Sequence, residues 1–454
     1  MPVFDRLLVA NRGEVAVRVI RAAHELGIEA IAVFSTADRD ALHVRLADHA
    51  VCIGPPSAAE SYLQISNVVA AAETMGCDAV HPGYGFLAEN AEFVRACVDN
   101  DLVFIGPTAD VVEQMGDKLR AKEAMREAGV PLVPGSDGEI GPEALRRAAA
   151  AAGFPVLLKA SAGGGGKGMR LVSSEDELED AFAGASAEAE AAFGDGAIYV
   201  EKLVAPARHV EIQVLCDAAG GVLTLGEREC SIQRRHQKLI EESPSSALDP
   251  ETREAMESTV ASACEAIGYR NAGTFEFLVG PDGAFYFIEV NCRLQVEHPV
   301  SELVTGIDIV REQIRIASGE ALAMTGRSSR NGHAIEIRIN AEDPARGFLP
   351  APGTVTRFVP PLGPGVRIDT AVESGTEIVP YYDSMIAKVI VSDDTRDAAI
   401  ARAERALREL VIEGIPTTRE LALDVLASTA FRRGDYSTST LVELESTLPS
   451  LGAA

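Results

Sequence analysis

Two acidic residues near the middle of the chain, Glu276 and Glu289, have the spacing of a metal-binding pair. They lie in residues 273–299, GTFEFLVGPDGAFYFIEVNCRLQVEHP, where two runs of aromatic and β-branched residues flank a Gly-Pro-Asp-Gly turn. This pattern predicts a β-hairpin. With a four-residue loop, Glu276 would pair with Phe287, and Glu289 would lie diagonally across from Glu276 on the same face. Two carboxylates there repel each other unless a cation lies between them, and oxygen ligands favour a hard cation such as Mg²⁺.

Polar side chains continue beyond Glu289 at every second position, at Asn291, Arg293, Gln295 and Glu297. On an extended strand they would share one face, which makes this stretch the first candidate for the reaction centre. An amphipathic edge strand with one solvated side has the same alternation. A helix would also align Glu289, Arg293 and Glu297, so the conformation beyond Asn291 stays open.

A glycine-rich segment, GGGGKG at residues 163–168, is a candidate phosphate-binding loop. It follows a predicted strand that ends in Lys159, and a second strand comes directly after it. A Walker A loop is excluded because the pattern G-x-x-x-x-G-K-[ST] and its following helix are both missing. Glycine runs are usually flexible linkers. The flanking strands favour instead a hairpin whose bare backbone can close over phosphates.

Other polar residues have both a structural and a functional interpretation. Glu201 and Lys202 end a predicted strand that could offer backbone groups to a purine, although a plain edge strand has the same sequence. Lys118 could bind a ligand or lie at the surface, and His209 could be an ordinary histidine of a sheet. Gln233, His236 and Lys238 could bind an anion or form a solvated loop. Arg338 could form a cross-strand ion pair.

Composition narrows the function classes. The chain of 454 residues carries a formal net charge of −27, from 68 acidic and 41 basic residues. Such a surface repels nucleic acid and acidic membranes, so we expect neither as a partner. No apolar run approaches the roughly 20 residues of a membrane span. Seven scattered cysteines without CxxC spacing, and an N-terminus without the pattern of a signal peptide, indicate a reducing cytoplasm.

The elements that must position these residues indicate an α/β and α+β multidomain chain of about three units. Residues 7–34 predict a strand, a helix ending at Gly27 and a second strand, which is a βαβ start. The segment 78–90 predicts a strand that leads into a loop around Tyr84. A last unit begins near Gly332, with alternating polar residues that include Arg338.

At this point the sequence resembles biotin carboxylase, the ATP-grasp component of biotin-dependent carboxylases. The matching passages are ANRGEVAVRVIRA, HPGYGFLAENAEF, MGDKLRAK, KASAGGGGKGMR, EKLVAPARHVEIQVL, ECSIQRRHQKLIEE, GTFEFL, FIEVNCRLQVEHPVSE, IRINAEDP and PYYDSMIAKVIV. The resemblance implies three parts: a Rossmann-like N-terminal domain (1–114), an ATP-grasp domain (115–320) with a glycine-loop lid at about 132–204, and a C-terminal α/β domain (331–446).

The resemblance also implies roles for individual residues. ATP would bind Lys118, Lys159, Gly164, Gly165, Gly166, Glu201, Lys202, Val204, His209, Gln233, His236 and Glu276. Mg²⁺ or Mn²⁺ would bind Glu276, Glu289 and Asn291. Bicarbonate would bind Lys238, Arg293, Gln295 and Val296, and biotin would bind Arg338 and Tyr84. The implied catalytic residues are Arg293, Glu297, Lys238 and Arg338, with Glu297 as the base that leads to carboxyphosphate.

Three departures from the family pattern, Ala162, Lys167 and Cys292, affect no implied catalytic group. The sequence has no Met-Lys-Met biotinylation site. We therefore expect biotin on a separate carrier protein and a carboxyltransferase on another chain. The resemblance also implies a homodimer. Two rival interpretations are another ATP-grasp ligase, which would have no reason to carry the RRHQK and RLQVEHP passages together, and a nucleotide-binding regulatory subunit, which would be expected to have lost the base or metal ligands.

Overall fold

The structure is a computed structural model that describes residues 4–136, 141–161 and 169–451. The N-terminal part is a parallel sheet in the order β3-β2-β1-β4-β5. Its strands are β1 (Arg6–Val9), β2 (Glu29–Ser35), β3 (His49–Gly54), β4 (Ala79–His81) and β5 (Val103–Phe104). Its helices are α1 (Gly13–Glu25), α2 (Leu42–Leu46), α3 (Ile65–Met75), α4 (Ala91–Asp99) and α5 (Ala109–Gly116). The apolar strands are buried by these helices, as parallel strands usually are.

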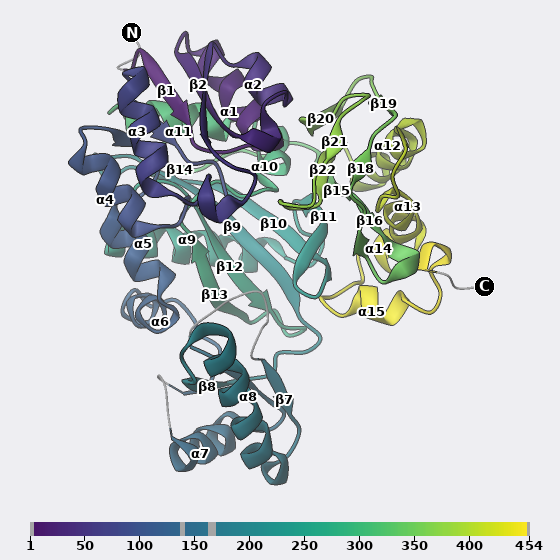
Figure 1. Cartoon of the computed structure of the whole chain (residues 1–454). Helices are drawn as coiled ribbons and strands as arrows, with labels where there is room; N and C mark the ends of the chain where they lie inside the picture. The colour runs from purple at the N-terminus through teal and green to yellow at the C-terminus, as the bar shows by residue number, and fades with distance from the viewer. Residues whose placement is uncertain (1–3, 137–140, 162–168, 452–454) are drawn as a thin grey trace.

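A large, mostly antiparallel sheet of nine strands forms the centre of the molecule (Figure 1). Its order is β13-β12-β9-β10-β11-β15-β22-β20, and β14 pairs with β10. The strands are β9 (Arg208–Cys216), β10 (Val222–Arg234), β11 (Gln237–Ser243), β12 (Asn271–Val279), β13 (Phe285–Asn291), β14 (Gly326–Arg327), β15 (His333–Asn340), β20 (Val366–Thr370) and β22 (Met385–Asp393). Since β11 pairs with β15, residues of the predicted central and C-terminal parts lie on neighbouring strands.

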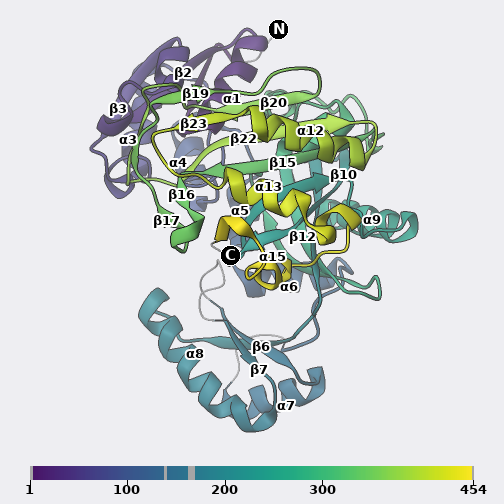
Figure 2. The ribbon, with the colours of Figure 1, turned by 90° about the vertical axis from the view of Figure 1, so that its right-hand side faces the viewer.

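A small subdomain projects from this body, and Figures 1 and 2 show it apart from the rest of the chain. It contains β6 (Val156–Ala160), β7 (Arg170–Val172) and β8 (Ile198–Lys202) in the order β7-β6-β8, with α7 (Pro142–Ala152) and α8 (Leu178–Phe193). Leu145, Val156, Leu158 and Val200 belong to a hydrophobic core of its own. A separate core lets such a unit change its position relative to the body without exposing shared apolar surface.

The remaining elements cover the central sheet and complete the C-terminal part. The helices are α6 (Lys118–Glu127), α9 (Pro250–Ile267), α10 (His298–Thr305), α11 (Ile309–Ala317), α12 (Arg396–Glu409), α13 (Arg419–Ala427), α14 (Thr429–Arg433) and α15 (Thr440–Leu444). The short strands are β16 (Glu342–Asp343), β17 (Leu349–Pro350), β18 (Gly353–Thr354), β19 (Arg357–Val359), β21 (Glu377–Ile378) and β23 (Val411–Glu413). Among the described residues, no helix is both long and apolar enough to cross a membrane.

Helix capping positions one predicted ligand directly. The Asp117 side chain accepts hydrogen bonds from the backbone N–H groups of Leu119 and Arg120, at 2.9 and 3.0 Å. This N-cap satisfies donors that the first turn of a helix leaves unpaired. Lys118 is therefore fixed as the first residue of α6.

Candidate active site

The β12–β13 hairpin places the two predicted metal ligands directly opposite each other. Glu276 pairs with Glu289 across the ladder, and Phe277 pairs with Phe287. The predicted pairing of Glu276 with Phe287 is wrong because Ile288 is an extra residue that forms a bulge in β13. The predicted shared face is retained, since directly opposite residues project to the same side of a sheet.

The polar row beyond Asn291 is not an extended strand. β13 ends at Asn291, residues 292–297 form a loop, and α10 begins at His298. The loop nevertheless turns its polar side chains toward the hairpin, as the contacts below show.

Glu276 is the acceptor on which four side chains of the site converge. Its Oε1 atom accepts hydrogen bonds from Lys238 Nζ at 2.9 Å, Asn291 Nδ2 at 2.8 Å and Gln295 Nε2 at 3.0 Å. Its Oε2 atom lies 2.8 Å from His209 Nε2. Burial disfavours the charge of this carboxyl group, but the charges of Lys238 and His209 outweigh burial and hold its pKa well below the ordinary value.

Lys238 joins three carboxylates at the centre of the site. Its Nζ atom donates to Glu211 Oε2 at 2.7 Å, Glu276 Oε1 at 2.9 Å and Glu297 Oε1 at 2.6 Å. Burial lowers the pKa of an amine, but these three acids raise the pKa of Lys238 well above its usual range. His209, Glu211 and Glu276 also have the spacing of a metal site. The ammonium of Lys238 is the cation that already neutralises two of them.

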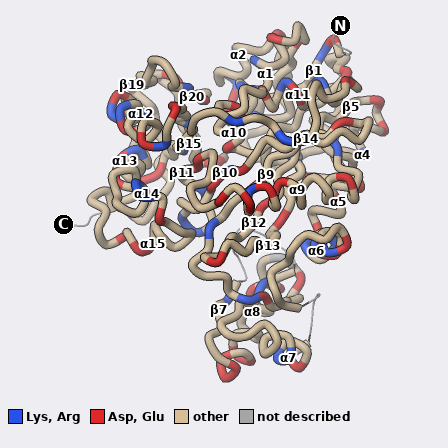
Figure 3. Tube along the Cα trace, turned by 180° about the vertical axis from the view of Figure 1, so that it is seen from behind, with Lys and Arg blue, Asp and Glu red and all other residues tan. Residues whose placement is uncertain are grey.

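Glu211 and Arg228 belong to this network although the sequence interpretation did not select them. Arg228 is fully buried, and its Nε atom donates to Glu211 Oε1. Its Nη1 atom donates to Gln213 Oε1 at 2.7 Å, and its Nη2 atom donates to Thr274 Oγ1 at 3.0 Å. The available signal was the position of Glu211, two residues after His209 on the same face of a predicted strand. Figure 3 shows the acidic and basic positions along β9, β10 and β12.

Glu297 lies between two cations. It is fully buried, and its Oε1 and Oε2 atoms accept from Lys238 Nζ at 2.6 Å and Arg338 Nη2 at 2.9 Å. Burial would raise the pKa of Glu297, but Lys238, Arg338 and Arg228 hold it well below the ordinary value. Glu297 is therefore an ionised carboxylate at neutral pH, as a proton acceptor must be.

Arg293 is held above the hairpin by Glu89, a third residue that was not predicted. Its Nε atom donates to Glu89 Oε2 at 2.8 Å, and its Nη2 atom donates to Asn291 Oδ1 at 2.6 Å. Gln295 Oε1 accepts from Arg293 Nη1 at 3.1 Å. Val296 comes next, and its carbonyl oxygen accepts from Lys388 at 2.8 Å. The four predicted bicarbonate ligands therefore all line the same short region between β11 and the start of α10.

A second basic cluster lies between α6 and the small subdomain. Lys122 of α6 and Lys159 of β6 both donate to the Glu201 carboxylate of β8. Lys118 is half-buried at the start of α6, where burial lowers its pKa and the charge of Glu289 raises it, with a net lowering. Lys118, Lys159 and Glu201 are brought together as predicted candidates, and Lys122 is an addition to them.

The side chain of Lys202 does not reach this cluster. Its Nζ atom donates to the Ala152 carbonyl at 3.2 Å, on the α7 side of the subdomain. Successive residues of a strand project to opposite faces. Because the Glu201 side chain faces the lysine cluster, the Lys202 side chain faces away from it. The backbone N–H of Lys202 donates to the Pro134 carbonyl at 2.7 Å, which leaves its carbonyl oxygen as the group that could face a ligand beside Glu201. Val204 follows β8 and donates no backbone hydrogen bond to another described residue.

The other predicted ligands lie on the borders of the site. Gln233 is buried and pairs with Lys238 in the ladder. His236 lies at the surface in the β10–β11 turn, where the partial desolvation of its ring and the charges of Lys159 and His209 lower its pKa. Tyr84 Oη donates to Glu14, and Arg338 contributes to its electrostatic surroundings. Gly164, Gly165 and Gly166 lie outside the described residues.

The hairpin acids fit a divalent cation. Glu276, Glu289 and Asn291 offer oxygen atoms of the kind that Mg²⁺ and Mn²⁺ prefer. Burial and the charge of Glu276 raise the pKa of Glu289, which forms no ion pair with another described side chain. A cation between the two carboxylates would remove that repulsion.

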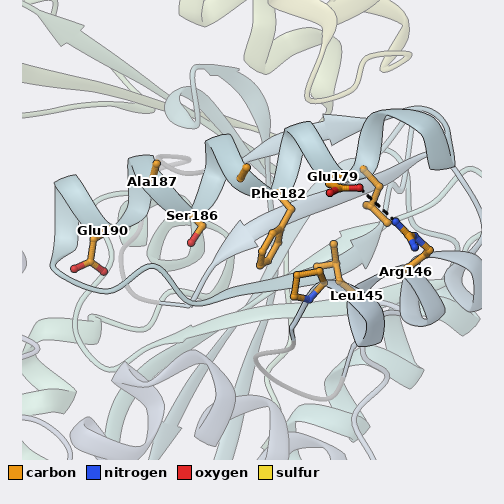
Figure 4. A pocket seen from close by; sticks show the side chains of 10 residues that line it. Leu145, Arg146, Glu179, Phe182, Ser186, Ala187 and Glu190 are labelled. Atoms are coloured by element: carbon orange, nitrogen blue, oxygen red, sulfur yellow. Dashed lines mark ion pairs between the residues drawn. The ribbon is translucent and has the colours of Figure 1, made fainter.

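A pocket of about 560 Å³ lies elsewhere, between α7 and α8 of the small subdomain (Figure 4). Its lining includes Leu145 and Phe182, with an ion pair between Arg146 Nη2 and Glu179 Oε2 at 3.6 Å. It contains none of the predicted site residues. The candidate site is therefore the cluster of converging charges on the central sheet.

Comparison with known proteins agrees with this geometry. Residues 3–112 match the family described as biotin carboxylase, N-terminal domain, and residues 336–443 match the biotin carboxylase C-terminal domain. Residues 117–325 match the ATP binding domain of the carbamoyl-phosphate synthase L chain. A biotin carboxylase from Nostoc sp. is 54% identical over 444 residues, which are 97% of this chain and 99% of that relative. The chain belongs to the biotin carboxylase family.

Two solved structures extend the similarity to three dimensions. A Campylobacter jejuni biotin carboxylase in complex with a β,γ-ATP ligand is 48% identical, with a TM-score of 0.94 over 97% of this chain and 99% of that chain. The biotin carboxylase domain dimer of Hydrogenobacter thermophilus 2-oxoglutarate carboxylase, in complex with MgADP, ADP and bicarbonate, is 49% identical, with a TM-score of 0.93 over 98% of both chains. The predicted three-domain biotin carboxylase fold and ATP-dependent ligase activity are confirmed.

Proposed function

We propose that this biotin carboxylase activates bicarbonate with ATP, through carboxyphosphate, and transfers the carboxyl group to biotin on a separate carrier protein. The observation that supports this most directly is the position of Lys238, which joins the base Glu297 to the nucleotide-side acid Glu276. The ammonium group of Lys238 therefore contacts both the proposed base and an acid of the proposed nucleotide and metal site.

ATP would lie between the small subdomain and the β12–β13 hairpin. The lysine cluster with Lys118 and Lys159 supplies positive charge for phosphates, and the Val204 N–H is available to the adenine ring. Mg²⁺ or Mn²⁺ on Glu276, Glu289 and Asn291 would neutralise charge on the transferred phosphoryl group. Phosphoryl transfer depends mainly on positioning and charge neutralisation, which such residues provide.

Bicarbonate would bind among Arg293, Gln295, the Val296 backbone and Lys238. Glu297 takes its proton, and a bicarbonate oxygen then attacks the γ-phosphorus as the bond to ADP breaks. The products of this step are carboxyphosphate and ADP. The low pKa of Glu297 makes it a weak base, so Lys238 and Arg293 must stabilise the anion that forms as the proton leaves.

Carboxyphosphate then breaks its C–O bond to release CO₂ and phosphate. The phosphate removes the N–H proton of biotin, and the biotin nitrogen attacks the carbon of CO₂. The negative charge that develops on the ureido oxygen needs a fixed cation, and Arg338 is the proposed one. Its Nη1 atom has no hydrogen-bond partner among the described residues, so it can donate hydrogen bonds to the oxyanion. Tyr84 would line the same biotin site.

We further propose a homodimer that works with a carrier protein and a carboxyltransferase on separate chains, in a reducing cytoplasm. The dimeric Hydrogenobacter relative supports the first part. The separate chains are supported by the similarity to the Nostoc sp. biotin carboxylase, 99% of whose length matches this chain.

The test is ATP hydrolysis by the purified chain, with and without bicarbonate and free biotin. We expect biotin to raise the rate only when bicarbonate is present. A rate that biotin leaves unchanged, in a preparation that binds ATP, would overturn the proposal.

A further inference from the structure

Two buried carboxyl groups lie behind Arg338, and the proposed reaction steps do not use them. Glu241 on β11 and Glu336 on β15 are directly opposite in the antiparallel ladder, and both are 0% exposed. Opposite residues in such a ladder project to the same side with their Cβ atoms about 5 Å apart. Glu241 Oε1 accepts from Arg338 Nε at 2.6 Å, on the opposite edge of the guanidinium from Nη1.

The two groups have too few partners for two negative charges. Both carboxyl oxygens of Glu336 and the Oε2 atom of Glu241 are buried without a hydrogen-bond partner among the described residues. Glu336 also forms no ion pair with a described side chain, whereas Glu241 pairs with Arg338. An isolated buried carboxylate takes up a proton rather than remain charged. A protonated Glu336 would carry an O–H donor. On the opposite strand, Glu241 Oε2 is an acceptor that has no donor in the described part of the chain.

Among the described residues, Lys388, the lysine on the strand next to Glu336, already has other partners. The charged and titratable neighbours of Glu336 are Lys388 on β22, Glu241 on β11, Arg338 on β15, Glu297 before α10 and Tyr84 after β4. Lys388 in turn faces Glu14 on α1, Arg367 and Asp369 on β20, and His298 on α10. Lys388 donates to the Val296 carbonyl at 2.8 Å and lies 3.3 Å from Glu14 Oε1. It lies 3.7 Å from Asp369 Oδ2.

We propose that Glu241 and Glu336 share one proton and act as a positioning pair for Arg338 during the biotin half of the reaction. This inference rests on the proposed function. The electrostatics agree: burial raises the pKa of Glu336 well above its ordinary value, and burial together with the charge of Glu297 raises that of Glu241 to about 7.

The pair matters because the charge of Glu297 changes during turnover. When Glu297 takes the bicarbonate proton, it becomes neutral and Arg338 loses one charged partner. Glu241 still holds Nε, so the guanidinium keeps its orientation toward biotin. With one shared proton the pair carries a single negative charge, which Arg338 balances. Loss of that proton at high pH adds a second charge, which competes with the biotin oxyanion for Arg338.

Glu241→Gln and Glu336→Gln test the pair, with Glu242→Gln as a matched control. Glu242 is the next residue on β11, and it binds His333, Arg396 and Tyr436 instead of Arg338. Each variant is assayed for bicarbonate-dependent ATP hydrolysis without biotin, for its stimulation by free biotin, and for thermal unfolding.

For Glu241→Gln we expect biotin-stimulated turnover to fall about tenfold or more, because a charged hydrogen bond to Arg338 is lost. The rate without biotin should stay within about twofold of wild type. Equal losses in both rates, or no loss of stimulation, would overturn the proposal. The Glu242→Gln control should keep the wild-type ratio of the two rates.

Glu336→Gln replaces the protonated acid by an amide that donates in the same place but cannot lose a proton. Its stimulated rate should match wild type at neutral pH. The wild-type rate should fall as pH rises and the pair loses its proton, and this alkaline fall should be absent in Glu336→Gln. Identical pH profiles would overturn the proposal even if Glu241→Gln fails to fold. A wild-type chain without any biotin stimulation would instead overturn the proposed function, and this inference with it.

Discussion

Replacing Glu297 by Gln removes the proposed base while it keeps the shape of the side chain. Glu297 accepts one hydrogen bond from Lys238 and one from Arg338, at 2.6 and 2.9 Å. A positioned general base contributes about 10²- to 10⁴-fold to a rate, so we expect turnover to fall by that amount. The amide cannot take the bicarbonate proton. Its NH₂ group would also face Lys238 or Arg338, which are themselves donors and cations.

The cost to folding should be smaller than the loss of turnover. Lys238 keeps Glu211 and Glu276 as partners, and Arg338 keeps Glu241, so neither cation is left alone. A hydrogen bond to a charged group contributes about 1.5–3 kcal/mol, and we expect a loss of stability in that range. ATP affinity should change by less than about threefold, because Glu276 keeps its contact with Lys238.

The assay pairs turnover with ATP binding measured by calorimetry. Glu302→Gln is the matched control, since Glu302 is a buried acid in α10 whose partners, Arg18 and Arg367, lie outside the Lys238 network. The control should lose stability and keep its turnover. If ATP affinity falls as far as turnover in Glu297→Gln, Glu297 is structural; if turnover stays within about tenfold of wild type, the assignment of the base is wrong.

Two further predictions concern the hairpin acids. Glu289→Gln should raise the Mg²⁺ concentration needed for half-maximal ATP hydrolysis by about tenfold, because one charged ligand is lost; an unchanged Mg²⁺ titration would contradict its role. The pKa of His209 is raised because the charge of Glu276 outweighs burial, so the stability that the protonated ring contributes is complete below about pH 6.5 and is lost as pH rises through the raised pKa. Urea unfolding from about pH 6 to about pH 9 should therefore show a decline in wild type that is smaller in His209→Gln, and parallel curves would contradict the assignment.

The family and most of the candidate site could be predicted from the sequence because its residues lie in short motifs. QVEHP and RRHQK carry Glu297 and Lys238, and the structure shows that these two side chains are in contact at 2.6 Å. The same-face argument for Glu276 and Glu289 also holds, although the register that supported it is wrong. Motifs show which residue types are present. The alternation of side chains along a strand then places Glu276 and Glu289 on the same face.

The rest depended on features that no local pattern contains. Leu239 is an extra residue in β11, because Lys238 and Ile240 pair with consecutive residues of β10. Lys238 and Glu241 are three residues apart and would face opposite sides of a regular strand, yet both contact the site through Glu297 and Arg338. The network of Arg228 and Glu211 was missed because it is assembled across neighbouring strands.

The most direct test of the account follows an oxygen atom. If bicarbonate attacks the γ-phosphorus, then ¹⁸O-labelled bicarbonate must transfer one of its oxygens to the phosphate that is released when biotin is carboxylated. Mass spectrometry of that phosphate should show one ¹⁸O per molecule, and phosphate released in unlabelled bicarbonate should show none. Phosphate that carries no ¹⁸O, while biotin is carboxylated and ATP is consumed, would contradict the formation of carboxyphosphate at this site.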